Sequence, residues 1–179
     1  MKKFFSLFLC LLLVAGLMTA CAKKDSTDSS SSAADLNMKD VVAAIEEVAP
    51  VSMALELSPS IEGSEDYMTD LFGLDMSTVE DYYGKTTQVN VSSDVVLMVK
   101  AVPGQVDAVK TALENRRSAI AASFEMYLES EYDKAVNGRV VTKGDYVLLV
   151  VAGDSTRIAD GEVDAVYAEI DDAIDKALA

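Results

Sequence analysis

The chain has 179 residues, with 15 Lys and Arg against 30 Asp and Glu, two Cys, and no His or Trp, and its formal net charge at pH 7 is −15. This length suits one ordinary domain, since domains span roughly 100–200 residues. The absence of His excludes Ser-His-Asp and Cys-His catalysis and any His-ligated zinc or iron. The negative charge argues against nucleic acid as a partner. We therefore assign no catalytic residue, no metal ligand and no cofactor, and we expect no nucleic-acid partner.

Residues 1–20 have the pattern of an export signal. Lys2 and Lys3 are followed by an apolar run over residues 4–14 and then by small residues that lead to Cys21. The apolar run is too short for a membrane span of about 20 residues. The segment 17–21, Leu-Met-Thr-Ala-Cys, resembles the lipobox of bacterial lipoproteins, in which a peptidase cleaves before the Cys and the thiol carries a diacylglycerol.

The lipobox resemblance implies a lipid anchor on Cys21 and a location at the extracytoplasmic face of the cell membrane. The alternative is ordinary signal cleavage, which would leave Cys21 as a free thiol. Residues 21–34 are rich in Ser and Asp and predict a flexible tether, because such a composition builds no core. Each buried methylene of an acyl chain contributes about 0.8 kcal/mol, so a diacyl anchor would hold firmly.

Residues 35–179 predict a single folded domain. A helix capped by Asp35 or Asn37 ends before Pro50, and residues 51–57 predict a short strand or an extended link. Two short helices are expected over residues 64–72 and 76–83, because Gly73 and Gly84 follow them directly.

The remaining elements alternate between strands and helices. We expect strands over residues 86–91 and 95–102, a long helix over 105–132, strands over 139–142 and 146–152 joined at Lys143-Gly144, and a last helix over 162–178. Hairpins joined by one helical crossover predict an α+β fold. The expected sheet is antiparallel or mixed with four strands, its helices packed mainly on one face, and a short helical segment precedes it.

The segment from Ser64 onward resembles a family of small, uncharacterised bacterial lipoproteins defined by a domain of unknown function. The resemblance rests on F-G-L-D-x-x-x-V-E-D-Y from Phe72 to Tyr82 and on the apolar strand that begins at Asp94. It also includes the Arg-bearing helix with Tyr127 and the run V-V-T-K-G-D-Y-V-L-L-V-V over residues 140–151. It implies a lipoprotein context and no activity.

Arg117 is the strongest candidate for a functional side chain. On a helical wheel it falls on the apolar face that Leu113, Ile120 and Phe124 define, and Arg116 flanks that face on the other side. A guanidinium there needs carboxylate or carbonyl partners, because an unpaired buried charge is costly. One interpretation is structural: its stem packs on the core, and its head reaches solvent or a structural carboxylate. The other is a pocket in which Arg117, with Tyr127 and Tyr146, recognises an anionic ligand.

Two other patterns have simpler explanations. Adjacent acidic residues are expected by chance in so acidic a chain, and a glycosidase cleft usually presents aromatic platforms that a chain without Trp lacks. Residues 154–164 resemble a calcium loop only faintly, since Ile158 occupies a ligand position, and we expect an acidic turn and a helix cap there.

These observations favour a membrane-anchored, extracytoplasmic lipoprotein that acts as a non-catalytic binding or accessory module of the cell envelope. Its expected partners are the membrane, through the lipid on Cys21, and an envelope protein. The alternatives are a His-free hydrolase that uses carboxylates and Tyr, or a binder of small anions through Arg117. The residues identify neither the ligand nor the oligomeric state.

Overall fold

The computed structural model describes residues 35–179. The predicted export signal, Cys21 and the tether lie outside the described residues. Across residues 35–179, no helix combines the length and the apolarity that crossing a membrane requires.

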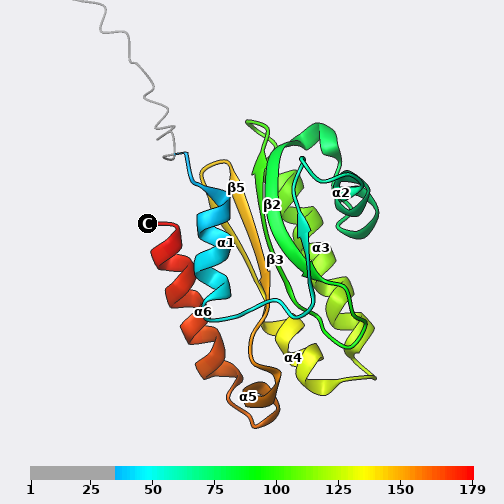
Figure 1. Ribbon diagram of the computed structural model, residues 1–179, viewed down its shortest axis with the longest axis vertical. Coiled ribbons are helices and arrows are strands. Elements are labelled where there is room, and N and C mark those ends of the chain that lie inside the picture. The colour runs from blue at the N-terminus through cyan, green and yellow to red at the C-terminus, as the bar shows by residue number, and fades with distance from the viewer. Residues whose placement is uncertain (1–34) are drawn as a thin grey trace, which may run out of the picture. The chain divides into compact units, whose positions relative to one another are not determined.

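The core of the fold is a five-stranded antiparallel sheet with the order β1-β2-β3-β5-β4 (Figure 1). Its strands are β1 (Ala54–Leu57), β2 (Val79–Thr87), β3 (Val95–Ala101), β4 (Arg139–Lys143) and β5 (Tyr146–Val151). The predicted α+β class and the antiparallel sheet are confirmed. The predicted strand number is wrong, because residues 54–57 form a paired edge strand where the sequence left the choice between a strand and an extended link.

Helices cover both faces of this sheet. The helical elements are α1 (Met38–Glu46), α2 (Ser64–Asp66), the π-helical turn η1 (Tyr67–Leu71), the 3-10 turn η2 (Met76–Thr78), α3 (Val106–Phe124), α4 (Glu129–Asn137), α5 (Ser155–Ala159) and α6 (Val163–Ala177). In Figure 1, α1 and α6 lie side by side against one face of the sheet, and α3 lies against the other.

The expectation that helices pack mainly on one face is wrong, and the two central strands explain why. Val96 and Met98 of β3 pack into a core with α1 and α6, whereas Val95, Leu97 and Val99 pack into a second core with α3. β5 alternates in the same way, and all its residues are buried. Strands that are apolar on both faces need cover on both faces.

The β2 strand replaces a predicted helix. Asp75 accepts a hydrogen bond from the Ser77 amide at 2.9 Å, but this cap starts a single 3-10 turn. From Val79 the chain is extended, and Gly84, predicted to end a helix, pairs with Leu57 and Leu97 inside the sheet. The strand predicted over residues 86–91 therefore begins earlier and ends at Thr87.

The predicted long helix over residues 105–132 is divided. α3 ends at Phe124, Leu128 is extended with φ −135° and ψ 104°, and α4 begins at Glu129. The change of direction turns Glu131 and Lys134 of α4 into the interior, where both are almost fully buried. The helix that Asn37 caps, the strands β4 and β5 and the last helix confirm their predictions within one or two residues.

Candidate functional site

The residues singled out from the sequence lie in different parts of the fold. Arg117 is partly buried on α3, and its Nη1 donates to the carbonyl oxygens of Gly138 at 2.9 Å and Val136 at 3.5 Å. These carbonyls lie at the C-terminal end of α4, where a helix leaves acceptors without partners and favours a cation. These hydrogen bonds agree with the structural interpretation, with carbonyls in place of a carboxylate, and Arg117 also lines a smaller hollow of about 310 Å³ between α3 and α4.

Tyr127 and Tyr146 do not line a common pocket with Arg117. Tyr127 follows α3, is 58% exposed, and stacks on Phe124 with ring centroids 6.2 Å apart. Tyr146 is buried in β5, on the sheet face that α1 and α6 cover, and its hydroxyl donates to Asp35 Oδ1 at 2.6 Å. The structure brings none of these three side chains together.

A hollow of about 550 Å³ lies between α3 and the loop that joins β2 to β3. Its lining contains the predicted Tyr127 and also Arg116, the neighbour of Arg117. The polar lining residues are Thr86, Thr87, Gln88, Asn90, Ser92, Ser93, Asp94, Arg116 and Ser123, and the apolar or aromatic ones are Leu71, Val89, Ile120, Phe124 and Tyr127. Such a volume is typical of sites for small molecules.

Arg116 has an unusual environment for an arginine of so acidic a protein. The guanidinium carbon lies 5.6 Å from the centre of the Phe72 ring, and Nε is buried without a hydrogen-bond partner among the described residues. Burial lowers the pKa of Arg116 from its usual value, and no described carboxylate opposes this effect. The group still carries its charge, because an arginine does not lose its proton in a protein. The hollow therefore contains a cation that lacks a counter-ion within residues 35–179.

The Asp94 carboxylate, which also lines the hollow, is ion-paired on its interior side. Lys134 Nζ lies 2.7 Å from Asp94 Oδ1 and 3.0 Å from Glu131 Oε2, and these three side chains are 1–6% exposed. The Ser52 amide donates to Asp94 Oδ2 at 3.0 Å. Asp94 and Glu131 share the one ammonium of Lys134, so the cluster keeps one net negative charge, and Asp94 forms no ion pair with Arg116 within residues 35–179.

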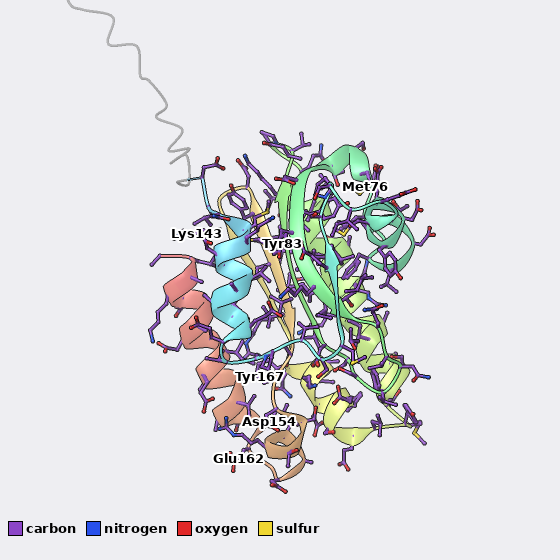
Figure 2. All side chains as sticks on the ribbon, in the orientation of Figure 1. Met76, Tyr83, Lys143, Asp154, Glu162 and Tyr167 are labelled. Atoms are coloured by element: carbon purple, nitrogen blue, oxygen red, sulfur yellow. The ribbon has the colours of Figure 1, made fainter. Side chains whose placement is uncertain are left out.

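The same buried ion cluster fixes the wall of the hollow. Glu131 Oε2 accepts from both the amide and the hydroxyl of Ser93 at 2.8 Å, and Ser155 of α5 donates to Glu131 Oε1. Tyr167 of α6, labelled in Figure 2, donates its hydroxyl to the main-chain carbonyl of Lys134. Hydrogen bonds from several elements thus hold Ser93, Asp94 and α4 in place. The cluster fixes the position of the loop that joins β2 to β3.

A second hollow, of about 590 Å³, surrounds Lys100, Asp35 and Tyr146 at the other end of β3. Lys100 Nζ lies 2.8 Å from Glu80 Oε1 and 3.4 Å from Asp35 Oδ1. The hydrogen bond that Lys100 donates to Glu80 raises the pKa of Lys100 above its usual value. Since this cation already has carboxylate partners, the hollow at Arg116 is the better candidate for an anion.

The acidic segment 154–164 contains a short helix, α5, that was not predicted from the sequence, and its cap is Asp154; Glu162, at the start of α6, makes no side-chain cap. Asp154 Oδ1 accepts from the amides of Thr156 and Arg157 at 2.8 and 3.2 Å and starts α5. Glu162 Oε2 accepts from Arg157 Nε at 2.9 Å, and Figure 2 labels both Asp154 and Glu162 at this end of the fold. Within residues 35–179, no group of acidic side chains has the arrangement of a metal site.

Sequence reasoning noted Arg116 only as a neighbour of Arg117 and missed the Lys134 cluster. A signal for the cluster exists, because residues 128, 131 and 135 share one helical face and two of them, Leu128 and Ala135, are apolar. A charged residue at the third position of that face needs a buried partner. No local pattern distinguishes Arg116 from Arg117, since the loop that leaves the hollow open is distant in the sequence.

Comparison with known proteins gives a family and no activity. The family model described as Domain of unknown function (DUF4358) matches residues 53–152, more than half of the chain. No curated protein and no solved structure matches. The match begins before the expected start at Ser64 and ends before the last helix, and it confirms the expected domain of unknown function. The chain belongs to the DUF4358 family.

Proposed function

We propose that this protein is a lipid-anchored, extracytoplasmic binding protein of the cell envelope and that its ligand carries an anionic group held at Arg116. The observation that carries the binding part is the partly buried guanidinium of Arg116, which opens on a hollow and has no carboxylate partner among the described residues. A partly buried charge without a carboxylate partner has a desolvation cost, and a ligand that supplies the counter-charge would offset it.

The path of the chain supports this proposal. Residue 35, which follows the predicted tether, is bonded to Tyr146 and Lys100, at the end of β3 opposite Asp94. At about 3.3 Å per residue, β3 separates these two ends by roughly 20 Å. A tether that joins the fold at Asp35 leaves the hollow at Arg116 on the far end of the sheet, open to a ligand or an envelope partner.

Replacing Cys21 with Ala is expected to abolish membrane attachment. In a bacterial host, the wild-type chain should incorporate labelled palmitate and sediment with the membranes, because acyl chains supply the binding energy. Cys21→Ala should lose the label and leave the membrane fraction. The matched control is Cys10→Ala, since Cys10 lies in the predicted signal and both variants remove one thiol. Equal labelling of the wild type and Cys21→Ala would refute lipidation.

Replacing Arg116 with Gln is expected to weaken anion binding by about 10- to 100-fold, since a hydrogen bond to a charged group contributes about 1.5–3 kcal/mol. The measurement is calorimetric titration of the detergent-purified full chain with acetate, 3-phenylpropionate and inorganic phosphate at low salt. Arg117→Gln is the matched control, because Arg117 is bound to the end of α4, and it should bind like the wild type. Binding that is the same in wild type and Arg116→Gln would exclude the proposed site.

A further inference from the structure

The charge of the hollow limits the charge of its ligand. Arg116 is the sole cationic side chain in the lining within the described residues, and Asp94 is already paired with Lys134. Lys134 is shared with Glu131, so this ion cluster and Arg116 together carry no net charge. A monoanion at Arg116 would add one negative charge to this region, whereas a phosphate dianion would add two, in a chain whose formal charge is −15.

The polar part of the lining offers hydrogen-bond donors for the oxygens of such an anion. The Ser92 and Thr87 hydroxyls each accept a main-chain N–H, from Asp94 at 3.2 Å and Val89 at 3.3 Å, which leaves their own hydrogens to donate. In contrast, Ser123 donates to the Ile120 carbonyl at 2.7 Å, and Ser93 donates to Glu131. These two hydroxyls and the Arg116 guanidinium line the same hollow, and all three are donors for carboxylate oxygens.

The other part of the lining is apolar and aromatic. Ile120 and Phe124 are 5% and 7% exposed, and Tyr127, stacked on Phe124, is 58% exposed. An aromatic ring with a free face and a polar hydroxyl is suited to contact an apolar group of a ligand while the hydroxyl stays in water. The lining of the hollow therefore has an apolar and aromatic part in addition to the cation of Arg116.

We infer that the hollow at Arg116 takes a small monocarboxylate that carries an apolar or aromatic group, in preference to a phosphate. This inference rests on the proposed function and adds the class of ligand. Arg116 binds the carboxylate, the hydroxyls of Ser92 and Thr87 donate to its oxygens, and Phe124 and Tyr127 contact the apolar group.

The test compares four probes by titration of the detergent-purified full chain at pH 8: 3-phenylpropionate, its neutral amide 3-phenylpropionamide, acetate and phenyl phosphate. We expect 3-phenylpropionate to bind at least about tenfold more tightly than each of the other three. Arg116→Gln should lose the preference for the carboxylate over the amide, and Arg117→Gln should keep it. Tyr127→Ser should weaken 3-phenylpropionate by about threefold to tenfold and leave acetate unchanged.

The outcomes separate the inference from the proposed function. Tightest binding of phenyl phosphate, lost in Arg116→Gln, would overturn the carboxylate class and leave an anion site at Arg116. Equal binding of the acid and the amide would show that the charge of Arg116 is not used, and this would overturn both. The wild type and Arg116→Gln are titrated in the same detergent. If no anion binds the wild type, the proposed site is overturned as well.

Discussion

Replacing Lys134 with Met is expected to lower the free energy of unfolding by about 3–5 kcal/mol. Lys134 is 1% exposed and is the shared ion-pair partner of Asp94 and Glu131, which lie 2.7 and 3.0 Å from its Nζ. Without the ammonium, two carboxylates remain buried with no cation, and breaking a buried ion pair from one side has a cost of this size. Urea denaturation of the full chain at pH 7, followed by circular dichroism, measures the loss.

Two comparisons make the Lys134 result specific. Lys110→Met removes an exposed lysine of α3 that lies 3.8 Å from Glu114, and it should change stability by no more than about 0.5 kcal/mol. The triple variant Asp94→Asn/Glu131→Gln/Lys134→Met should be more stable than Lys134→Met, because it removes the uncompensated charges too. A loss in Lys134→Met no larger than that in Lys110→Met would show that the cluster does not stabilise the fold.

The pH dependence provides a second readout of the same cluster. Burial alone would raise the pKa of Glu131, but the hydrogen bond from Ser155, the charge of Lys134 and the Ser93 amide together hold it below its usual value. A lowered carboxyl pKa stabilises the fold above its unfolded-state pKa, near 4.5, and this contribution is lost as the pH falls through the folded pKa. Lys134→Met removes the charge and the hydrogen bond of Lys134, so the pKa of Glu131 is higher in the folded variant than in the folded wild type. The difference in the free energy of unfolding between wild type and Lys134→Met should therefore be smaller at pH 4 than at pH 7.

Replacing Gly84 with Ala is expected to destabilise the protein by about 3 kcal/mol, at the upper end of the cost of overpacking. A Cβ atom at this position would lie 2.5 Å from the carbonyl oxygen of Val96 and 2.7 Å from the Cα of Leu97. Both atoms belong to the main chain of β3, the central strand, so neither can move without disturbing the pairing with β2. Thermal denaturation of the full chain measures the effect.

The control for Gly84 is Gly63→Ala. Gly63 has φ 78° and nothing within 4 Å of an added Cβ, so an alanine there meets backbone strain of about 1 kcal/mol and no clash. The Gly84 variant should therefore melt well below the Gly63 variant. Equal melting temperatures would mean that the close approach of β2 and β3 at Gly84 is relaxed at little cost.

The sequence predicts those elements whose residues repeat with a clear period. The three- and four-residue spacing of Val166, Ile170 and Ile174 predicts α6, and the apolar run of β5 predicts a buried strand. Gly84 led to the wrong prediction of a helix end. A glycine is typical of the end of a helix, and it is equally typical of a strand position that another backbone approaches closely. Only the contact with β3 decides between the two.

The candidate site is predictable only in part, because it also depends on contacts between segments that are distant in the sequence. The helical wheel places Arg117 on the apolar face of α3 and Arg116 beside it, but which of the two guanidiniums lines the hollow next to the loop between β2 and β3 depends on that loop. Arg117 finds main-chain carbonyls at the end of α4, whereas Arg116 faces the hollow. Glu131 and Lys134, spaced as an ordinary surface pair, become buried because α4 packs against Ser93 and Asp94.

β3 and β5 are apolar on both faces, and this determines which fragment of the protein can fold by itself. The family match over residues 53–152 contains the whole sheet together with α3 and α4, but it omits α1 and α6. A fragment with those limits would present Val96, Met98, Leu148 and Val150 to water. An apolar sheet surface of this kind associates with other chains. The unit that folds is therefore longer than the unit that the family model matches, and it includes both terminal helices of the described chain.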